Sequence, residues 1–180
     1  MSDDDEHFQR VLVPVDFEPA SDEAIESGKA ITAGAQHIEF SEASVRAVKM
    51  AAALCKTSGG KLYMVHVTPP MQYTTMYTGP VSLPAGVIEE IHQKARQTSL
   101  AALKYLTVTY CQGIQVEHCV GPGQASLAVL EEAERIKSDL IVMAASGRSR
   151  VARFFVGSTA DRVIREADCP VLVIPAAPHP

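Results

Sequence analysis

Short apolar segments alternate with longer amphipathic segments along almost the whole chain. Most of the short segments are rich in Val, Ile and Leu, which is typical of strands buried on both faces. One of them, residues 115–120, alternates polar and apolar side chains, so we expect it at an edge of the sheet. Strands that alternate with helices indicate βαβ units and a mainly parallel sheet. The five expected strands are residues 10–15, 61–67, 115–120, 139–144 and 171–174.

Four helices are expected between these strands, because small or apolar side chains recur every three or four residues. The glycine pair Gly59-Gly60 marks the end of the first, and Asp168-Cys169-Pro170 closes the last. A chain of 180 residues has the size of one domain with a substantial core. We therefore expect a single three-layer α/β domain with a doubly wound, mainly parallel sheet of five strands. The expected helices are residues 41–58, residues 85 to about 106, a third marked by Leu127, Leu130 and Ala133 that ends at about Lys137, and a last one that opens at Ser158 and is marked as far as Ala167.

Charge and cysteine usage exclude several classes of protein. The formal net charge of −5 disfavours bulk attraction to nucleic acid, and residues 1–8 form an acidic segment that we expect to be a solvated tail. The first apolar run, VLVPV, is too short for a signal peptide or a membrane span. We expect a cytoplasmic protein with reduced, mostly buried thiols; redox sensing is the alternative. The four cysteines, which show no CxxC or zinc-ligand spacing, are Cys55, Cys111, Cys119 and Cys169.

Two regions are additional to the strands and helices of a minimal five-strand fold. Residues 68–84 form a long loop with four prolines, and loops of this length are usually functional or mobile. Residues 18–40 are inserted after the first strand. The sequences that begin at Asp16 (DFEPASDEAI) and at Glu39 (EFSEASVRAV) match at an offset of 23, with Ser21 over Ser44. This match is either a local duplication of the first strand-to-helix junction or chance.

The last quarter of the chain combines glycines, hydroxyls and arginines between two expected strands. Gly147 is followed, after nine residues, by Gly157, Ser158 and Thr159 at the start of a short helix. Glycine lets backbone N–H groups approach a ligand, and a helix N-terminus adds unpaired donors and a partial positive charge. The pattern predicts a phosphate site. The alternative is a glycine that merely enters a helix with Ser158 as its N-cap. Three arginines either extend positive charge toward the phosphate or simply keep the loop solvated: Arg148, Arg150 and Arg153.

Several of these segments resemble the universal stress protein family, in its single-domain UspA type. The nucleotide-binding branch of that family carries the pattern G-x2-G-x9-G-S/T, which here reads Ala144-x2-Gly147-x9-Gly157-Ser158. Ala144 therefore replaces the first glycine, and its methyl group would either crowd the ligand or restrict the backbone. The segments that carry the resemblance are VLVPVDF, SEASVRAVKMAAALCKTSGGKL, LYMVHV, SDLIVMAASGRS and FFVGSTADRVIREADCPVLVIP.

The resemblance implies a strand order of 3-2-1-4-5 and ATP, with or without Mg²⁺, across the carboxyl ends of strands 1 and 4. The strand order reverses there, which is the expected ligand crevice of an open α/β sheet. It also implies that Asp16, after Pro14 and Val15, meets the nucleoside, although Asp16 alternatively caps the next turn. The other implied contacts are the backbone of Val67 with the adenine edge, Met143 and Ala144 with base and ribose, Gly147 and Arg148 with the phosphate chain, and Gly157, Ser158 and Thr159 with its far end.

Other patterns are weaker. The segment Gly121-Pro122-Gly123 lacks the third glycine of a dinucleotide-binding motif, and Asp139 begins the following strand instead of ending it. No Walker motif occurs, and no nucleophile–histidine set stands at a recognisable spacing. His66 and His118 lie in expected strands, and we interpret both as satisfied core histidines.

The resemblance implies a cytoplasmic, ATP-binding stress-response regulator that forms a homodimer through the strand Val171 to Ile174, without nucleic-acid or membrane partners. We expect no enzymatic role, because phosphoryl transfer needs a positioned metal, a water-orienting group and charge stabilisation, and no such set is evident. The alternatives are a nucleotide-free dimeric interaction module and a slow ATP hydrolase or phosphotransferase. We expect residues 18–40 to form a helix-bearing insertion, starting near Ser21, beside the crevice or the dimer interface.

Overall fold

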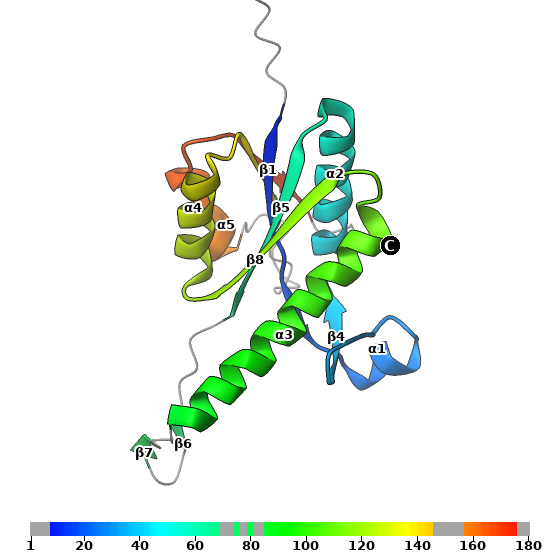
Figure 1. Ribbon diagram of the computed structural model, residues 1–180, viewed down its shortest axis with the longest axis vertical. Helices are drawn as coiled ribbons and strands as arrows, with labels where there is room; N and C mark the ends of the chain where they lie inside the picture. Colours follow the sequence, from blue (N-terminus) through cyan, green and yellow to red (C-terminus); the bar gives the residue numbers. More distant parts are fainter. Residues whose placement is uncertain (1–7, 69–73, 76–78, 81–84, 146–156, 176–180) are drawn as a thin grey trace, which may run out of the picture.

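The protein is described by a computed structural model that covers residues 8–68, 74–75, 79–80, 85–145 and 157–175. Five parallel strands form the central sheet in the order β10-β9-β1-β5-β8. Numbered along the chain among themselves, these strands read 3-2-1-4-5 from the β8 edge, so the expected order is confirmed. Figure 1 shows β1 at the centre of the sheet. The bounds are β1 Arg10–Pro14, β5 Lys61–Thr68, β8 Gln115–Pro122, β9 Leu140–Ala144 and β10 Val171–Ile174.

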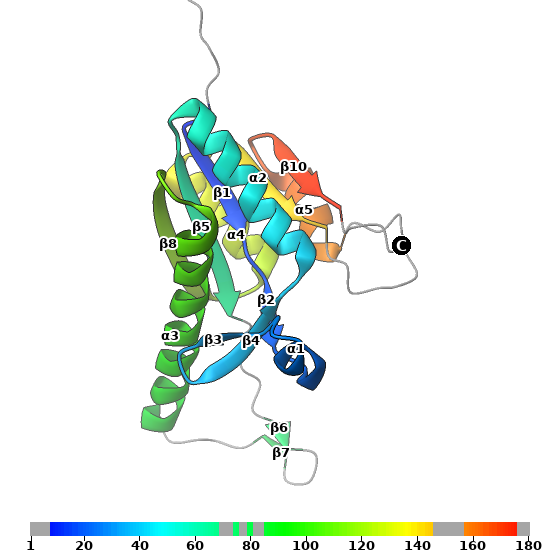
Figure 2. The same cartoon turned by 90° about the vertical axis from the view of Figure 1, so that its right-hand side faces the viewer.

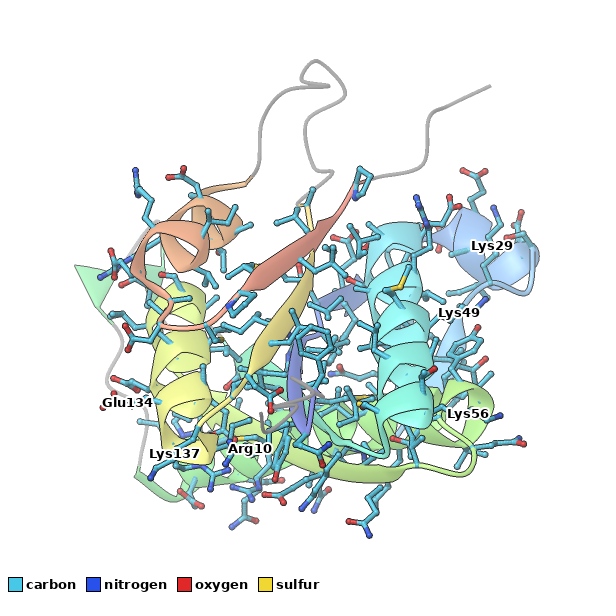
Figure 3. All side chains as sticks on the ribbon, turned by 90° about the horizontal axis from the view of Figure 1, so that it is seen from above. Arg10, Lys29, Lys49, Lys56, Glu134 and Lys137 are labelled. Carbon is cyan, nitrogen blue, oxygen red and sulfur yellow. The ribbon has the colours of Figure 1, made fainter. Side chains whose placement is uncertain are left out.

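Two helices cover each face of this sheet. Helices α2 (Glu42–Ser58) and α3 (Ala85–Tyr110) pack on one face, and α4 (Ala125–Ile136) and α5 (Ser158–Glu166) pack on the other. Figure 3 looks onto the amino ends of the strands, with Lys49 of α2 and Glu134 of α4 on opposite sides of the sheet. The three expected layers are therefore present.

Alternate residues of the central strands supply two separate cores. Val11 and Val13 of β1 face α2 and α3, whereas Leu12 faces α4 and α5. All three are fully buried, as expected for an apolar strand in the middle of a doubly covered sheet. The expected strand bounds are correct to within two residues, and β8 lies at an edge as predicted. Helix α3 continues four residues beyond the expected Leu106, because Cys111 beyond its end is also buried and keeps the last turn on the core.

The insertion forms a small three-stranded antiparallel sheet and one short helix. The strand order is β2-β4-β3, and the elements are β2 Phe17–Pro19, α1 Asp22–Glu26, β3 Ile31–Ala33 and β4 Gln36–Phe40. The expected helix is confirmed, with Ser21 as its N-cap. Ser41, not Ser44, is the N-cap of α2, so the proposed alignment of Ser21 with Ser44 does not match equivalent positions.

The insertion packs on α3 at the carboxyl end of the sheet. Ala33 and Ile38 form a third, small core with Ala102 of α3. Figure 2 shows β2, β3, β4 and α1 below the carboxyl ends of β1 and β5, with α3 running alongside. The insertion therefore lies on the side of the sheet where the ligand site is expected. Of the long segment 68–84, the described parts beyond β5 form the paired strands β6 (Thr74–Thr75) and β7 (Gly79–Pro80).

The amino ends of the strands are held together by side-chain hydrogen bonds to the backbone. The carboxylate of Asp139, just before β9, accepts from the backbone N–H groups of Gln9 (2.9 Å) and Arg10 (3.0 and 3.1 Å). Ser58, at the end of α2, donates to the carbonyl oxygen of Phe8 at 2.6 Å. Arg10 lies near the centre of this end in Figure 3. The chain is thereby fixed before it enters the central strand.

Candidate functional site

The ladder between β1 and β9 ends early. These strands pair at Val11 with Leu140 and at Leu12 with Ile141. Beyond these two pairs, β1 remains paired with β5 as far as Pro14, and β9 remains paired with β10 as far as Ala144. The backbones of the two central strands therefore part toward their carboxyl ends, where the strand order also reverses. This is the place at which open α/β sheets bind ligands.

The residues after β1 lie at this position. Pro14 is the half-buried last residue of the strand, Val15 is buried, and Asp16 is exposed. The backbone N–H of Val15 donates to the carbonyl oxygen of Val65 at 2.8 Å, so the chain still follows β5 as it leaves the sheet. The structure thus places Asp16 two residues beyond the end of β1, on the carboxyl side of the sheet and past the end of the β1–β9 ladder.

Val67 lies one residue before the end of β5, since the strand extends to Thr68. It is half-buried and stands opposite Gly121 of β8. The end of β5 is tied to β8, because the N–H of Gly123 donates to the carbonyl oxygen of Thr68 at 3.1 Å. Val67 is therefore at the carboxyl edge, one strand away from Asp16.

Ala144 has the ordinary backbone of a strand. Met143 is buried and Ala144 is half-buried, and both pair with β10. Among the described residues, Lys137 is the one non-glycine with a positive φ. A methyl group at position 144 thus costs no backbone strain, and of the two effects considered for this replacement, a restricted backbone is excluded. Whether the methyl group of Ala144 crowds a ligand is a question for a binding experiment.

Helix α5 begins at Ser158, as predicted, and Gly157 is its N-cap. Gly157 has no side chain to accept from the first-turn N–H groups, whereas its carbonyl oxygen accepts from Asp161 at 2.9 Å. Ser158 is exposed and Thr159 is half-buried. A short connection joins the end of α5 to the amino end of β10, so the N-terminus of α5 points toward the edge where β9 ends. The predicted Gly147 and Arg148, with the rest of 146–156, lie outside the described residues.

His66 has a position that its sequence context did not reveal. It is buried and hydrogen-bonded, as expected: its Nδ1 lies 2.8 Å from the carbonyl oxygen of Val15. Its ring also stacks on Phe17, with centroids 4.1 Å apart. Burial lowers the pKa of His66, and the hydrogen bond to Val15 and the charge of Asp16 raise it by smaller amounts. The histidine contacts both neighbours of Asp16, and nothing in the local pattern VHV predicts this.

His118 and the weak dinucleotide-like segment Gly121-Pro122-Gly123 lie in β8 or directly after it. His118 is half-buried, and its Nε2 lies 2.8 Å from Thr107 Oγ1. Burial lowers its pKa. Gly121 and Pro122 belong to β8, and Asp139 lies at the opposite, amino end of the sheet. His118 is therefore hydrogen-bonded as expected but only half-buried, and the rejection of a dinucleotide site at Gly121-Pro122-Gly123 remains a prediction.

The four cysteines are unpaired thiols. Cys55 and Cys111 are buried, whereas Cys119 and Cys169 are half-buried. Burial raises the pKa of both Cys55 and Cys111 to about 11, which keeps these two sulfurs protonated and unreactive at neutral pH. Within residues 8–68, 85–145 and the other described ranges, no three His, Cys, Asp or Glu side chains are grouped to hold a metal ion. None of the described helices combines the length and apolarity that a bilayer span requires.

Known proteins with a similar sequence or fold agree with one another. The model of the universal stress protein family matches residues 37–175, a range that begins in β4 and leaves β1 and Asp16 outside. Universal stress protein MJ0531 of Methanocaldococcus jannaschii is 30% identical over 138 residues, which cover 74% of this chain and 76% of that protein.

Solved structures share the fold at lower identity. The structure of the hypothetical protein MJ0577 is similar with a TM-score of 0.68 at 18% identity, covering 96% of this chain and 99% of that chain. A universal stress protein crystallised in complex with cAMP is similar with a TM-score of 0.51 at 20% identity, covering 95% and 99%.

Proposed function

This chain belongs to the universal stress protein family, and from this premise we propose that it binds ATP or a related adenine nucleotide at the carboxyl ends of β1 and β9. The early end of the β1–β9 ladder carries the proposal, since it frees backbone groups of both central strands at the point where the strand order reverses. The cAMP complex of a protein with a similar fold supports an adenine nucleotide as the ligand.

In the proposed complex, Asp16 and the backbone of Val67 contact the nucleoside, and Met143 and Ala144 line it from β9. Gly147 and Arg148 contact the phosphate chain, and α5 receives its far end. The N-terminus of α5 suits that role, because Gly157 leaves the first-turn N–H groups without a side-chain acceptor from the cap residue. Mg²⁺ would accompany the phosphates as part of the ligand.

We propose that the nucleotide acts as a regulatory ligand of a cytoplasmic homodimer. The proposed interface is β10, an edge strand on which Leu172 is 37% exposed. Helix α2 packs against β9 and β10, and its exposed Met50 adds a second apolar side chain on this part of the surface. A charged residue at the interface, Leu172→Asp, should convert the dimer to a monomer in light scattering; an unchanged mass would reject this interface.

The first test asks whether the purified protein carries a bound nucleotide and which one it is. Protein purified under native conditions is denatured, and any released nucleotide is identified by mass spectrometry. The nucleotide-free protein is then titrated with ATP and Mg²⁺ by calorimetry. We expect micromolar binding that Gly157→Val abolishes, because a branched side chain at the cap would occupy the approach to the first-turn N–H groups. The matched control is Gly86→Ala, at an exposed position in the first turn of α3 where an added Cβ meets nothing within 4 Å.

The titration also separates the other functions that the sequence leaves open. Absence of released nucleotide and of binding heat, with an intact dimer, would favour a nucleotide-free interaction module. Steady phosphate release that Asp16→Ala abolishes in a folded protein would favour a hydrolase. We propose binding without such turnover.

A further inference from the structure

One side chain contacts both chain neighbours of Asp16. His66 of β5 lies 2.8 Å, through Nδ1, from the carbonyl oxygen of Val15, and its ring stacks on Phe17 at 4.1 Å with an angle of 20° between the planes. His66 is 7% exposed. The exposed Asp16 thus lies between two residues that are fastened to the same buried ring.

The hydrogen bond fixes the state of this ring. A carbonyl oxygen accepts and does not donate, so the proton must reside on Nδ1 of His66. Burial lowers the pKa of His66, which keeps the ring neutral at neutral pH. The neutral ring with its proton on Nδ1 leaves Nε2 as an acceptor.

The insertion holds the second contact in place. Phe17 belongs to β2 and pairs with Phe40 of β4, and their rings meet edge to face with centroids 5.9 Å apart. Phe40 in turn stacks on Tyr105 of α3 at 6.3 Å. A continuous set of rings therefore connects His66 in the central sheet, through the insertion, to α3.

We propose that His66 is a positioning residue of the nucleotide site, which fixes the backbone on both sides of Asp16 and so directs its carboxylate toward the ligand. Without such fixation, a residue that follows a strand would lose backbone freedom when a ligand binds, and this loss would weaken binding. Prior fixation removes this cost from the binding free energy. The effect on the ligand rests on the proposed function, whereas the fixation of Asp16 does not.

The fixation is tested without nucleotide, by ¹⁵N relaxation of the backbone N–H of Asp16. We expect a rigid order parameter of about 0.85 in the wild type and a value below about 0.6 in His66→Leu. His66→Asn, whose amide can donate from a position close to that of Nδ1, should restore much of the rigidity. His118→Leu is the control, because it removes another hydrogen-bonded strand histidine, whose partner is Thr107 and not a neighbour of Asp16.

The effect on the ligand is tested by a double-mutant cycle with ATP and Mg²⁺. His66→Leu should weaken binding about tenfold when Asp16 is present and less than about twofold in an Asp16→Ala background. A merely structural role of His66 would weaken binding equally in both backgrounds. Circular dichroism and cooperative thermal unfolding establish that each variant is folded. If His66→Leu is not, His66→Phe replaces it, because Phe keeps a ring beside Phe17 but has no donor for the carbonyl oxygen of Val15.

The relaxation measurement and the ATP-binding cycle can fail independently of each other. If the wild type does not bind ATP, the proposed function is rejected, and the relaxation data still decide whether His66 fixes Asp16. If Asp16 is equally rigid in His66→Leu and in the wild type, the positioning role is wrong even if ATP binds. An equal loss of affinity in both backgrounds of the cycle would also overturn it.

Discussion

The two ends of the central sheet are built in different ways. At the amino end, Asp139 and Ser58 make hydrogen bonds to the backbone just before β1, and β1 and β9 are paired. At the carboxyl end, these two strands no longer pair with each other, and His66 contacts both residues that flank the exposed Asp16. Bonds at the amino end fix the position of the central strand. At the carboxyl end, the separation of β1 from β9 gives up backbone pairing at the place that we propose for the ligand.

From this comparison we expect stability and the proposed function to depend mainly on opposite ends of the same strand. A change at the amino end should lower the free energy of unfolding and leave nucleotide affinity unchanged in the folded protein. A change at the carboxyl end should alter nucleotide affinity more than it alters the free energy of unfolding. The expected effects run from the largest, at Gly60, to the smallest, the pH dependence of stability.

The largest effect is expected at Gly60. A Cβ at this position would overlap the carbonyl oxygen of Phe8, so the backbone before β1 must move. We expect Gly60→Ala to lower the free energy of unfolding by about 2 to 3 kcal/mol in urea titrations, with ATP affinity of the folded protein unchanged. Gly86→Ala, at an exposed position in the first turn of α3 where an added Cβ meets open space, should lower neither quantity. A loss of affinity in folded Gly60→Ala would show that the two ends are coupled.

The insertion should affect binding more than the stability of the main cores. Replacement of residues 18–39 by Asn-Gly keeps Phe17 and Phe40 but removes the small core of Ala33 and Ile38. We expect a folded protein in which the dissociation constant for ATP rises about fivefold, or about 1 kcal/mol, because Phe17 loses its support. Calorimetry and light scattering measure affinity and dimerisation. The exposed Ile25→Ala on α1 is the control; unchanged affinity and dimerisation after the replacement would contradict a role for the insertion.

Ala144→Gly should change nucleotide affinity and stability in opposite directions. Removal of the methyl group gives the ligand more room, so we expect ATP to bind about threefold more tightly. The same change introduces glycine into a strand and should cost about 0.5 to 1 kcal/mol of stability. Titration and urea unfolding of one preparation measure both. If affinity does not rise, Ala144 does not crowd the nucleotide.

The smallest expected effect is the pH dependence of stability. Burial lowers the pKa of His66 in the folded state, so the unfolded state binds more protons once the pH falls below the ordinary histidine value of about 6.5. The stabilisation is present above that value and is lost as the pH falls toward the folded pKa. The free energy of unfolding should therefore decrease between pH 7 and pH 5, and less so in His66→Asn. His118, whose pKa burial also lowers, contributes in the same direction, so the comparison is repeated in a His118→Leu background.

The sequence predicts the main sheet better than the site. Strands such as Val11 to Val13 are buried on both faces, and such strongly apolar runs are recognisable without tertiary information. The strands of the insertion are too short for this: β2 and β3 have three residues each, fewer than an alternating pattern needs. Only its helix, with the N-cap Ser21, was predictable.

Within the site, the sequence predicts groups that end strands and misses contacts between distant segments. The places of Asp16 and Ala144 at strand ends were predictable because each stands at the end of an apolar run, whereas their contact with a nucleotide remains a prediction. The stacking of Phe17 on His66 joins residues 49 positions apart, and neither has a sequence pattern that specifies the other. Gly147 and Arg148 remain predictions.

The pairing of Phe17 with Phe40 has a consequence for how this chain could have arisen. Directly opposed residues of an antiparallel pair have Cα atoms roughly 4.5 to 5.5 Å apart. The insertion therefore leaves the domain almost where it enters, and a tight turn could take its place without displacing β1 or α2. Because its ends adjoin, gain or loss of this segment in one genetic event would leave the elements on either side in place, which makes the junction a natural position for grafting a module from another protein.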